Sequence, residues 1–204
     1  MNLLRKVTAK SWEHAGELEG LHGGFAARHT AGRIGLTLFL LVISSLFGLF
    51  LISYYNRSLF PDWEVLSEPG LLWFNTALLV LASIAMQRAS NAAKRNALGS
   101  MRQSVLAGGL LTLAFIGGQV VAWSQLVDAG YYARGNPAIA FFYLLTGLHA
   151  LHLAGGLWFL GLLGLKIRRE RDMEVVLRRV TLGATYWHYL LLVWLAMFAL
   201  LLMT

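Results

Sequence analysis

The stretch IGLTLFLLVISSLFGLFLISYY, residues 34–55, decides the fold class of this chain because it is apolar almost throughout and has no charged residue. A helix needs about 20 such residues to cross the hydrocarbon core of a bilayer, which is about 30 Å thick. In lipid, backbone polar groups must bond within the segment, so a stretch of this kind forms a helix. Residues 34–55 are therefore predicted to be a transmembrane helix.

Four further apolar stretches follow, at residues 71–87, 104–127, 138–165 and 186–203. Apolar residues make up 57% of the 204-residue chain and charged residues 13%, against about 25% charged residues in a soluble domain. None of the stretches alternates with the period of two that a barrel strand shows. The sequence thus predicts an all-α integral membrane bundle of five transmembrane helices, residues 34–204, after an amphipathic N-terminal segment, residues 1–33.

Lysine and arginine are distributed unevenly between the connecting segments. Most of the 17 lie in the N-terminal segment and in the second and fourth connections, whereas the first and third connections hold only Arg57 and Arg134. The positive-inside rule then predicts a cytoplasmic N-terminus and a periplasmic C-terminus. We expect a multi-pass protein of the bacterial cytoplasmic (inner) membrane. The basic residues behind the net charge of +7 lie between apolar runs, which indicates a role in topology, and no nucleic acid is expected as a partner.

Ionisable side chains are scarce inside the predicted spans, which disfavours an ion-coupled transporter. His149 and His152 share a face of the fourth span, and His188 lies near the start of the fifth. Counting along the helices puts His149 about 24 Å from the inner end and His188 within about one turn of it. We therefore expect these imidazoles to form hydrogen bonds across helices, with an intrinsic b-type cytochrome as the alternative.

Small residues in a span let two helices approach closely. Gly155 and Gly156 occur as a pair in the fourth span, and both are expected to lie against another helix. A leucine in place of Gly156 should then weaken assembly.

Three motifs resemble those of subunit III of the haem–copper terminal oxidases, the cytochrome c oxidase subunit III family, in its short five-helix bacterial form. The first is Trp73-Phe74-Asn75-Thr76. The others are TGLHALH, residues 146–152, followed by Gly155 and Gly156, and Tyr186-Trp187-His188-Tyr189 followed by Val193 and Trp194. They occur in the order of the family's motifs, and the resemblance extends from about Leu66 to the C-terminus.

The resemblance implies an accessory, non-catalytic subunit in aerobic electron transport from cytochrome c or quinol. Such a subunit packs beside subunit I, with subunit II and small subunits as further partners, binds phospholipid, and supports stability and proton uptake. Haem and copper are expected in the partner subunits and no cofactor, metal or catalytic residue in this chain. The structural or lipid-cleft candidates are Glu68, Trp73, Asn75, His149, His152, Trp187, His188 and Trp194.

Three positions depart from the family pattern, and each is one where a carboxylate is common. Gly70, Ala122 and Leu191 occupy them here, and Glu68 is the nearest substitute for the first. These differences indicate a divergent branch, so an accessory subunit of a nitric-oxide reductase is the alternative within the family.

Overall fold

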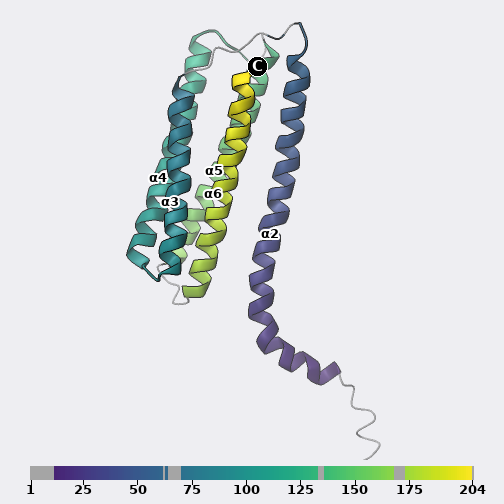
Figure 1. The fold of residues 1–204 in the computed structure, drawn as a ribbon, viewed down its shortest axis with the longest axis vertical. Helices are drawn as coiled ribbons and strands as arrows, with labels where there is room; N and C mark the ends of the chain where they lie inside the picture. The colour runs from purple at the N-terminus through teal and green to yellow at the C-terminus, as the bar shows by residue number, and fades with distance from the viewer. Residues whose placement is uncertain (1–11, 62, 64–69, 133–135, 168–172, 204) are drawn as a thin grey trace, which may run out of the picture. The chain divides into compact units, whose positions relative to one another are not determined.

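The structure is a computed structural model that describes residues 12–61, 63, 70–132, 136–167 and 173–203. These residues form five helices, which Figure 1 shows as ribbons: α2 (Trp12–Ser58), α3 (Leu71–Lys94), α4 (Leu98–Asp128), α5 (Pro137–Ile167) and α6 (Met173–Met203). All five contain a segment that is long and apolar enough to cross a membrane. The predicted all-α fold, with five helices long and apolar enough to span a membrane, is therefore confirmed over the described residues.

The helices extend beyond the apolar stretches that predicted them. The largest differences are α2, which begins at Trp12, and α6, which begins at Met173 rather than near Tyr186. The additional turns of α6 contain Glu174, Arg178 and Arg179. These charged residues lower the hydropathy of the segment, so it was not predicted as part of the membrane span, but Glu and Arg are good helix formers. Glu174 also lies in the first turn, where a negative charge favours the helix dipole.

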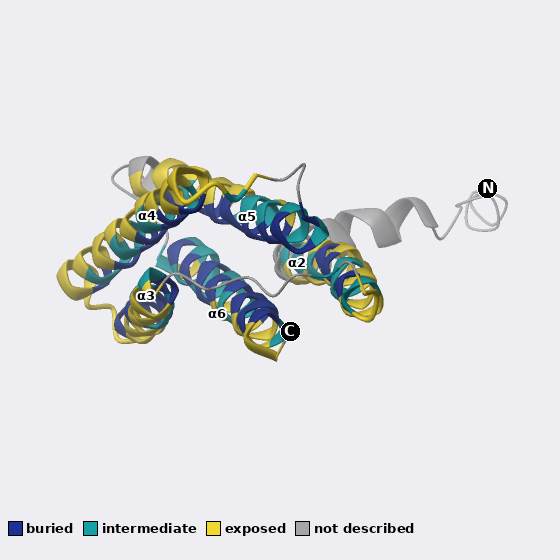
Figure 2. Ribbon diagram, turned by 90° about the horizontal axis from the view of Figure 1, so that it is seen from above, coloured by how far each residue is buried: buried dark blue, intermediate teal, exposed yellow. Residues whose placement is uncertain are grey.

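The chain divides into two compact units, residues 1–39 and 40–204. The first unit contains the described helix up to Phe39, and the second contains the rest of α2 with α3 to α6. In the second unit, α3 packs on α4 and α6, and α5 also packs on α4 and α6. Seen from above, α4 and α5 form one layer and α3 and α6 the other (Figure 2).

Local signals in the sequence fix the ends of these helices. The α3–α4 connection is a tight turn in which Asn96 adopts a positive φ of 55°, a conformation that Asn tolerates better than most residues. At the start of α5, the side-chain oxygen of Asn136 accepts a hydrogen bond of 2.8 Å from the Ala138 amide. Pro137 then occupies the first helical position, where its missing N–H costs nothing.

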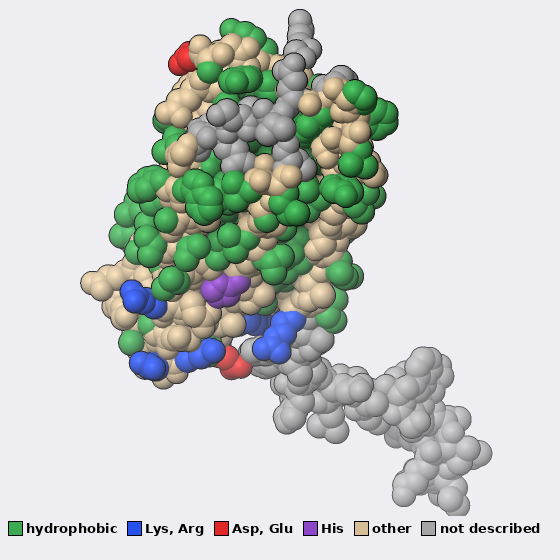
Figure 3. Space-filling view, turned by 45° about the horizontal axis from the view of Figure 1, so that its top comes forward, with side chains coloured by type: hydrophobic (Ala, Val, Ile, Leu, Met, Phe, Trp, Pro, Cys, Tyr) green, Lys and Arg blue, Asp and Glu red, His purple; other side chains and the backbone are tan. Residues whose placement is uncertain are grey.

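Large aromatic side chains fill the interior of the second unit. Trp187, Trp194, Phe115 and Phe142 are fully buried. The face of the molecule that Figure 3 shows is also largely hydrophobic, with Lys and Arg gathered toward one end. The most exposed apolar side chains of the second unit include Leu106, Leu151, Trp158 and Leu192. A surface of this kind belongs in lipid or against another protein.

Candidate functional site

The motif residues of three helices meet inside the bundle, and a tryptophan–threonine contact joins two of the motifs. The indole N–H of Trp194 on α6 donates a hydrogen bond of 2.9 Å to the hydroxyl of Thr76 on α3. Thr76 in turn donates to the carbonyl of Leu72 in its own helix at 2.8 Å. This bond to the Leu72 carbonyl holds the Thr76 hydroxyl in one rotamer and leaves its oxygen free to accept the hydrogen bond from the indole.

The same arrangement occurs twice more. Trp187 on α6 donates to Thr112 on α4 at 2.9 Å, and Trp123 on α4 donates to Thr146 on α5 at 3.0 Å. Both threonines donate to the carbonyl four residues earlier in their own helices. We call these three contacts the Trp–Thr bonds. Together they connect α3 to α6, α6 to α4 and α4 to α5.

Sequence reasoning did not single out Thr112 or Trp123 as partners in such a network. A lone Thr in an apolar span is common, and Trp123 lies where an interfacial aromatic residue is expected. The signal was the recurrence of Thr and Trp on neighbouring spans, which becomes specific only once the helix rotations are known.

His149 is fully buried, yet neither of its ring nitrogens has a hydrogen-bond partner among the described residues. Its ring centroid lies 5.3 Å from that of Trp194, 5.8 Å from that of Phe115 and 6.5 Å from that of Phe47. The expectation that His149 bonds across helices is therefore wrong, because the neighbours that enclose it are aromatic carbons.

The other two motif histidines differ from His149 and from each other. His188 connects α6 to α3: Nε2 donates to the Gln87 side-chain oxygen at 2.9 Å, and Nδ1 accepts from the Ser83 hydroxyl. For His188 the predicted bonding across helices is confirmed. The Nδ1 of His152 lies 2.7 Å from the Leu148 carbonyl of its own helix, so its side-chain bond does not cross helices.

The predicted difference in depth between the histidines is also wrong. The Tyr186 hydroxyl donates a hydrogen bond of 2.9 Å to the carbonyl of His152, so residues near 186–188 lie level with His152. The error arose because α6 begins at Met173, well before Tyr186. The three imidazoles nevertheless differ in their hydrogen bonds, although the ring of Phe47 lies against both His149 and His152, at 6.5 and 5.5 Å between centroids. Among the described residues, no three His, Cys, Asp or Glu side chains form a group that could hold a metal ion.

The paired glycines of α5 behave differently from each other. A Cβ placed on Gly156 would lie 2.9 Å from a ring carbon of Tyr186 and 3.0 Å from one of Trp187, whereas a Cβ on Gly155 would meet nothing within 4 Å. The predicted helix contact is therefore confirmed for Gly156 and wrong for Gly155, which faces away from α6.

A buried amide pair joins α3 to α4. The side-chain nitrogen of Asn75 donates to the Gln119 side-chain oxygen at 3.4 Å, and both residues have no exposed surface. The remaining oxygen of Asn75 has no hydrogen-bond partner in the described part of the chain. It occupies the space where a Cβ on Gly118 would lie, so Gly118 makes room for this amide.

Two predicted site residues remain. Trp73 is 60% exposed, and its ring packs edge-on against Phe198 with centroids 5.0 Å apart. Glu68 lies outside the described residues.

Comparison with known proteins identifies the family to which the chain belongs. The chain is 29% identical over 175 residues to cytochrome c oxidase subunit 3 of Thermostichus vulcanus, covering 82% of this chain and 85% of that protein. It is 26% identical over 162 residues to cytochrome bo(3) ubiquinol oxidase subunit 3 of Pseudomonas aeruginosa, covering 77% and 75%. A sequence model described as cytochrome c oxidase subunit III matches residues 7–203, so the likeness begins well before Leu66. Because that match covers nearly the whole chain, the protein belongs to the cytochrome c oxidase subunit III family.

Proposed function

We propose that this chain is the accessory, non-catalytic subunit III of a respiratory haem–copper oxidase that reduces O2 to water. The similar proteins are named as subunits of cytochrome c oxidase and of a bo(3) ubiquinol oxidase, which supports an accessory subunit of a haem–copper oxidase. In this proposal the chain packs beside subunit I, in contact also with subunit II. It binds membrane phospholipid and supports stability and proton uptake in the catalytic subunit.

The observation that carries the proposal is what the family motifs do in this bundle. Thr76, Trp194, Tyr186 and His188 each use their polar atoms to join one helix to another. They are therefore occupied in holding the scaffold together. The redox chemistry then belongs to partner subunits, where haem and copper are placed by this proposal.

The charge distribution supports a cytoplasmic N-terminus in a bacterial inner membrane. Cations lie near the α3–α4 connection and the start of α6, at the end of the bundle where Ser90 of α3 bonds with Thr181 of α6. They are Arg88, Lys94, Arg95, Arg102, Arg178 and Arg179. Positive residues concentrate on the cytoplasmic side of membrane proteins, which supports an orientation with this end inside and the C-terminus of α6 in the periplasm.

The test is purification of the tagged chain from its own membranes in a mild detergent. We expect it to copurify with a haem-bearing subunit and the Soret band to belong to that partner. In a strain that lacks the chain, the catalytic subunit should keep its spectrum but lose activity sooner during continuous turnover. Stoichiometric haem on the isolated chain, or unchanged turnover lifetime without it, would contradict the proposal.

A further inference from the structure

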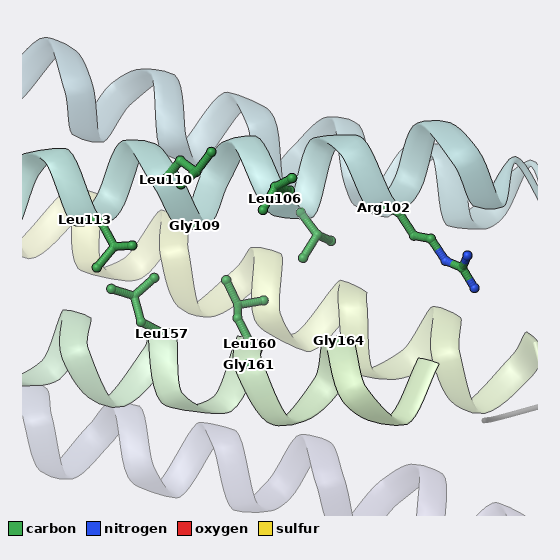
Figure 4. A pocket seen from close by; sticks show the side chains of 10 residues that line it. Arg102, Leu106, Gly109, Leu110, Leu113, Leu157, Leu160, Gly161 and Gly164 are labelled. Carbon is green, nitrogen blue, oxygen red and sulfur yellow. The ribbon is translucent and has the colours of Figure 1, made fainter. Parts of the chain in front are cut away.

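An apolar groove of about 490 Å³ lies between α4 and α5. Figure 4 shows leucine side chains and glycine backbone along its walls and one cation, Arg102, at its end. Its lining residues are Arg102, Val105, Leu106, Gly109, Leu110 and Leu113 of α4 and Leu157, Leu160, Gly161 and Gly164 of α5. The volume lies within the range of about 300–1,000 Å³ that is usual for small-molecule sites.

The length and direction of the groove match one leaflet of a bilayer. The α4 lining runs from Arg102 to Leu113, which is about 16 Å at 1.5 Å per residue, close to half of a hydrocarbon core about 30 Å thick. Since α5 runs in the opposite direction, Gly164 lies toward the Arg102 end and Leu157 toward the Leu113 end (Figure 4). Arg102 is thus at one end of the groove, which we call its mouth, and Leu113 and Leu157 lie toward the other end.

Arg102 is available to a ligand at this mouth. Its side chain is exposed, and no described residue forms an ion pair with it. A guanidinium offers paired donors that suit the oxygens of a phosphate, while its methylene stem can lie along apolar surface. Lys94 and Arg95 lie close by in the chain, at the α3–α4 connection, and add to the positive potential of this end.

We propose that the groove binds an acyl chain of an anionic glycerophospholipid, with the lipid phosphate at Arg102. The charge of the mouth selects the head group, and the leucine-lined floor receives the hydrocarbon. This inference rests on the lipid binding of the proposed function and makes it specific, because it names the place on the chain and the class of lipid. Loss of the lipid and loss of the partner subunit are separate readouts in the experiment below.

The experiment uses the full chain, purified, stripped of lipid and offered dioleoyl-phosphatidylglycerol or dioleoyl-phosphatidylcholine in detergent. Native mass spectrometry measures the retained lipid. We expect the wild type to prefer phosphatidylglycerol and Arg102→Gln to lower that affinity about fivefold, the effect of one basic residue at an anionic lipid surface. Arg95→Gln is the matched control, since it removes the same charge at the same end without lining the groove.

A second pair of variants fills the groove. Gly161 and Gly164 line it, and a Cβ on either would meet nothing within 4 Å, so Gly161→Leu and Gly164→Leu add bulk to the groove without a clash inside the chain. We expect both to reduce retention of the lipid. Gly147→Leu is their control, because Gly147 is equally open on the same helix but does not line the groove.

Three results would overturn the inference: equal affinity for the two lipids, an equal effect of Arg102→Gln and Arg95→Gln, or unchanged lipid retention in the groove-filling variants. Purification of the same tagged variants from their own membranes in a mild detergent reports whether the haem-bearing partner is retained. If the variants lose that partner while keeping phosphatidylglycerol, the groove holds a partner helix and the lipid assignment is wrong. If lipid and partner are both retained, the inference fails and the proposed function stands.

Discussion

Trp187 on α6 and Thr112 on α4 are both fully buried and are joined by a hydrogen bond of 2.9 Å. Thr112 also donates to the Gly108 carbonyl at 2.8 Å, so its O–H is already used and its oxygen accepts from the indole. Thr112→Val keeps the shape of the side chain but leaves the indole N–H without its acceptor. We expect a loss of about 0.5–2 kcal/mol in the free energy of unfolding in detergent.

The control for this substitution is Thr185→Val. Thr185 is exposed, and among the described residues its hydroxyl bonds only to the Thr181 carbonyl of its own helix, so its removal should change stability little. The double variant Thr112→Val/Trp187→Phe should lose less than the sum of the two single variants. Strict additivity would mean that the bond contributes nothing.

Gly156 and Gly155 provide a second test, on neighbouring positions of one helix. Gly156→Leu must push aside the rings of Tyr186 and Trp187, and overpacking of this kind costs about 1–3 kcal/mol. Gly155→Leu meets open space and should leave the α5–α6 contact intact. The yield of folded chain and its thermal unfolding in detergent report the difference. Equal behaviour of the two variants would show that α5 is rotated relative to this structure.

Gly118 and Asn75 allow a test by compensation. Gly118→Ala places a methyl group where the Asn75 side-chain oxygen lies, and we expect it to destabilise the α3–α4 pair by about 1–3 kcal/mol. Asn75→Ala in the same chain removes the obstructing amide and should restore part of that loss. Gly117→Ala is the control, since nothing lies within 4 Å of its Cβ position. Failure of Asn75→Ala to rescue would contradict the contact.

His149→Phe tests both the unpaired imidazole and the b-type cytochrome alternative. Because His149 has no hydrogen-bond partner among the described residues, an apolar ring removes no bond and should lower stability by less than about 1 kcal/mol. His188→Phe breaks the contacts with Ser83 and Gln87 and should cost more. The Soret band of the purified complex should not change in His149→Phe; its loss would mean that this histidine binds haem.

The number and class of the helices could be predicted because a bilayer requires about 20 apolar residues for each crossing. The helix ends could not, because a membrane helix continues past the lipid wherever its polar residues favour helix, as α6 does from Met173. That misplaced end produced the wrong depth for His188. The difference between Gly155 and Gly156 depends on the rotation of α5 about its axis, which a run of apolar residues on all sides does not encode.

The family motifs identified where the helices meet but not how each residue contributes. Trp194 and Trp187 were predicted as site residues, and the structure gives them hydroxyl partners on two other helices. His149 was expected to bond across helices because a buried polar group normally does. Its surroundings of Phe47, Phe115 and Trp194 come from three separate helices, so no local pattern in the sequence could reveal them.

The three Trp–Thr bonds are built from neutral groups alone. The voltage across an energised membrane does work of about 2.3 kcal/mol on each elementary charge moved through 100 mV. An indole and a hydroxyl carry no net charge, so the voltage does no such work on them. The geometry of these contacts is therefore insensitive to voltage. We therefore expect these three contacts to join the helices in the same way in a resting and in an energised membrane.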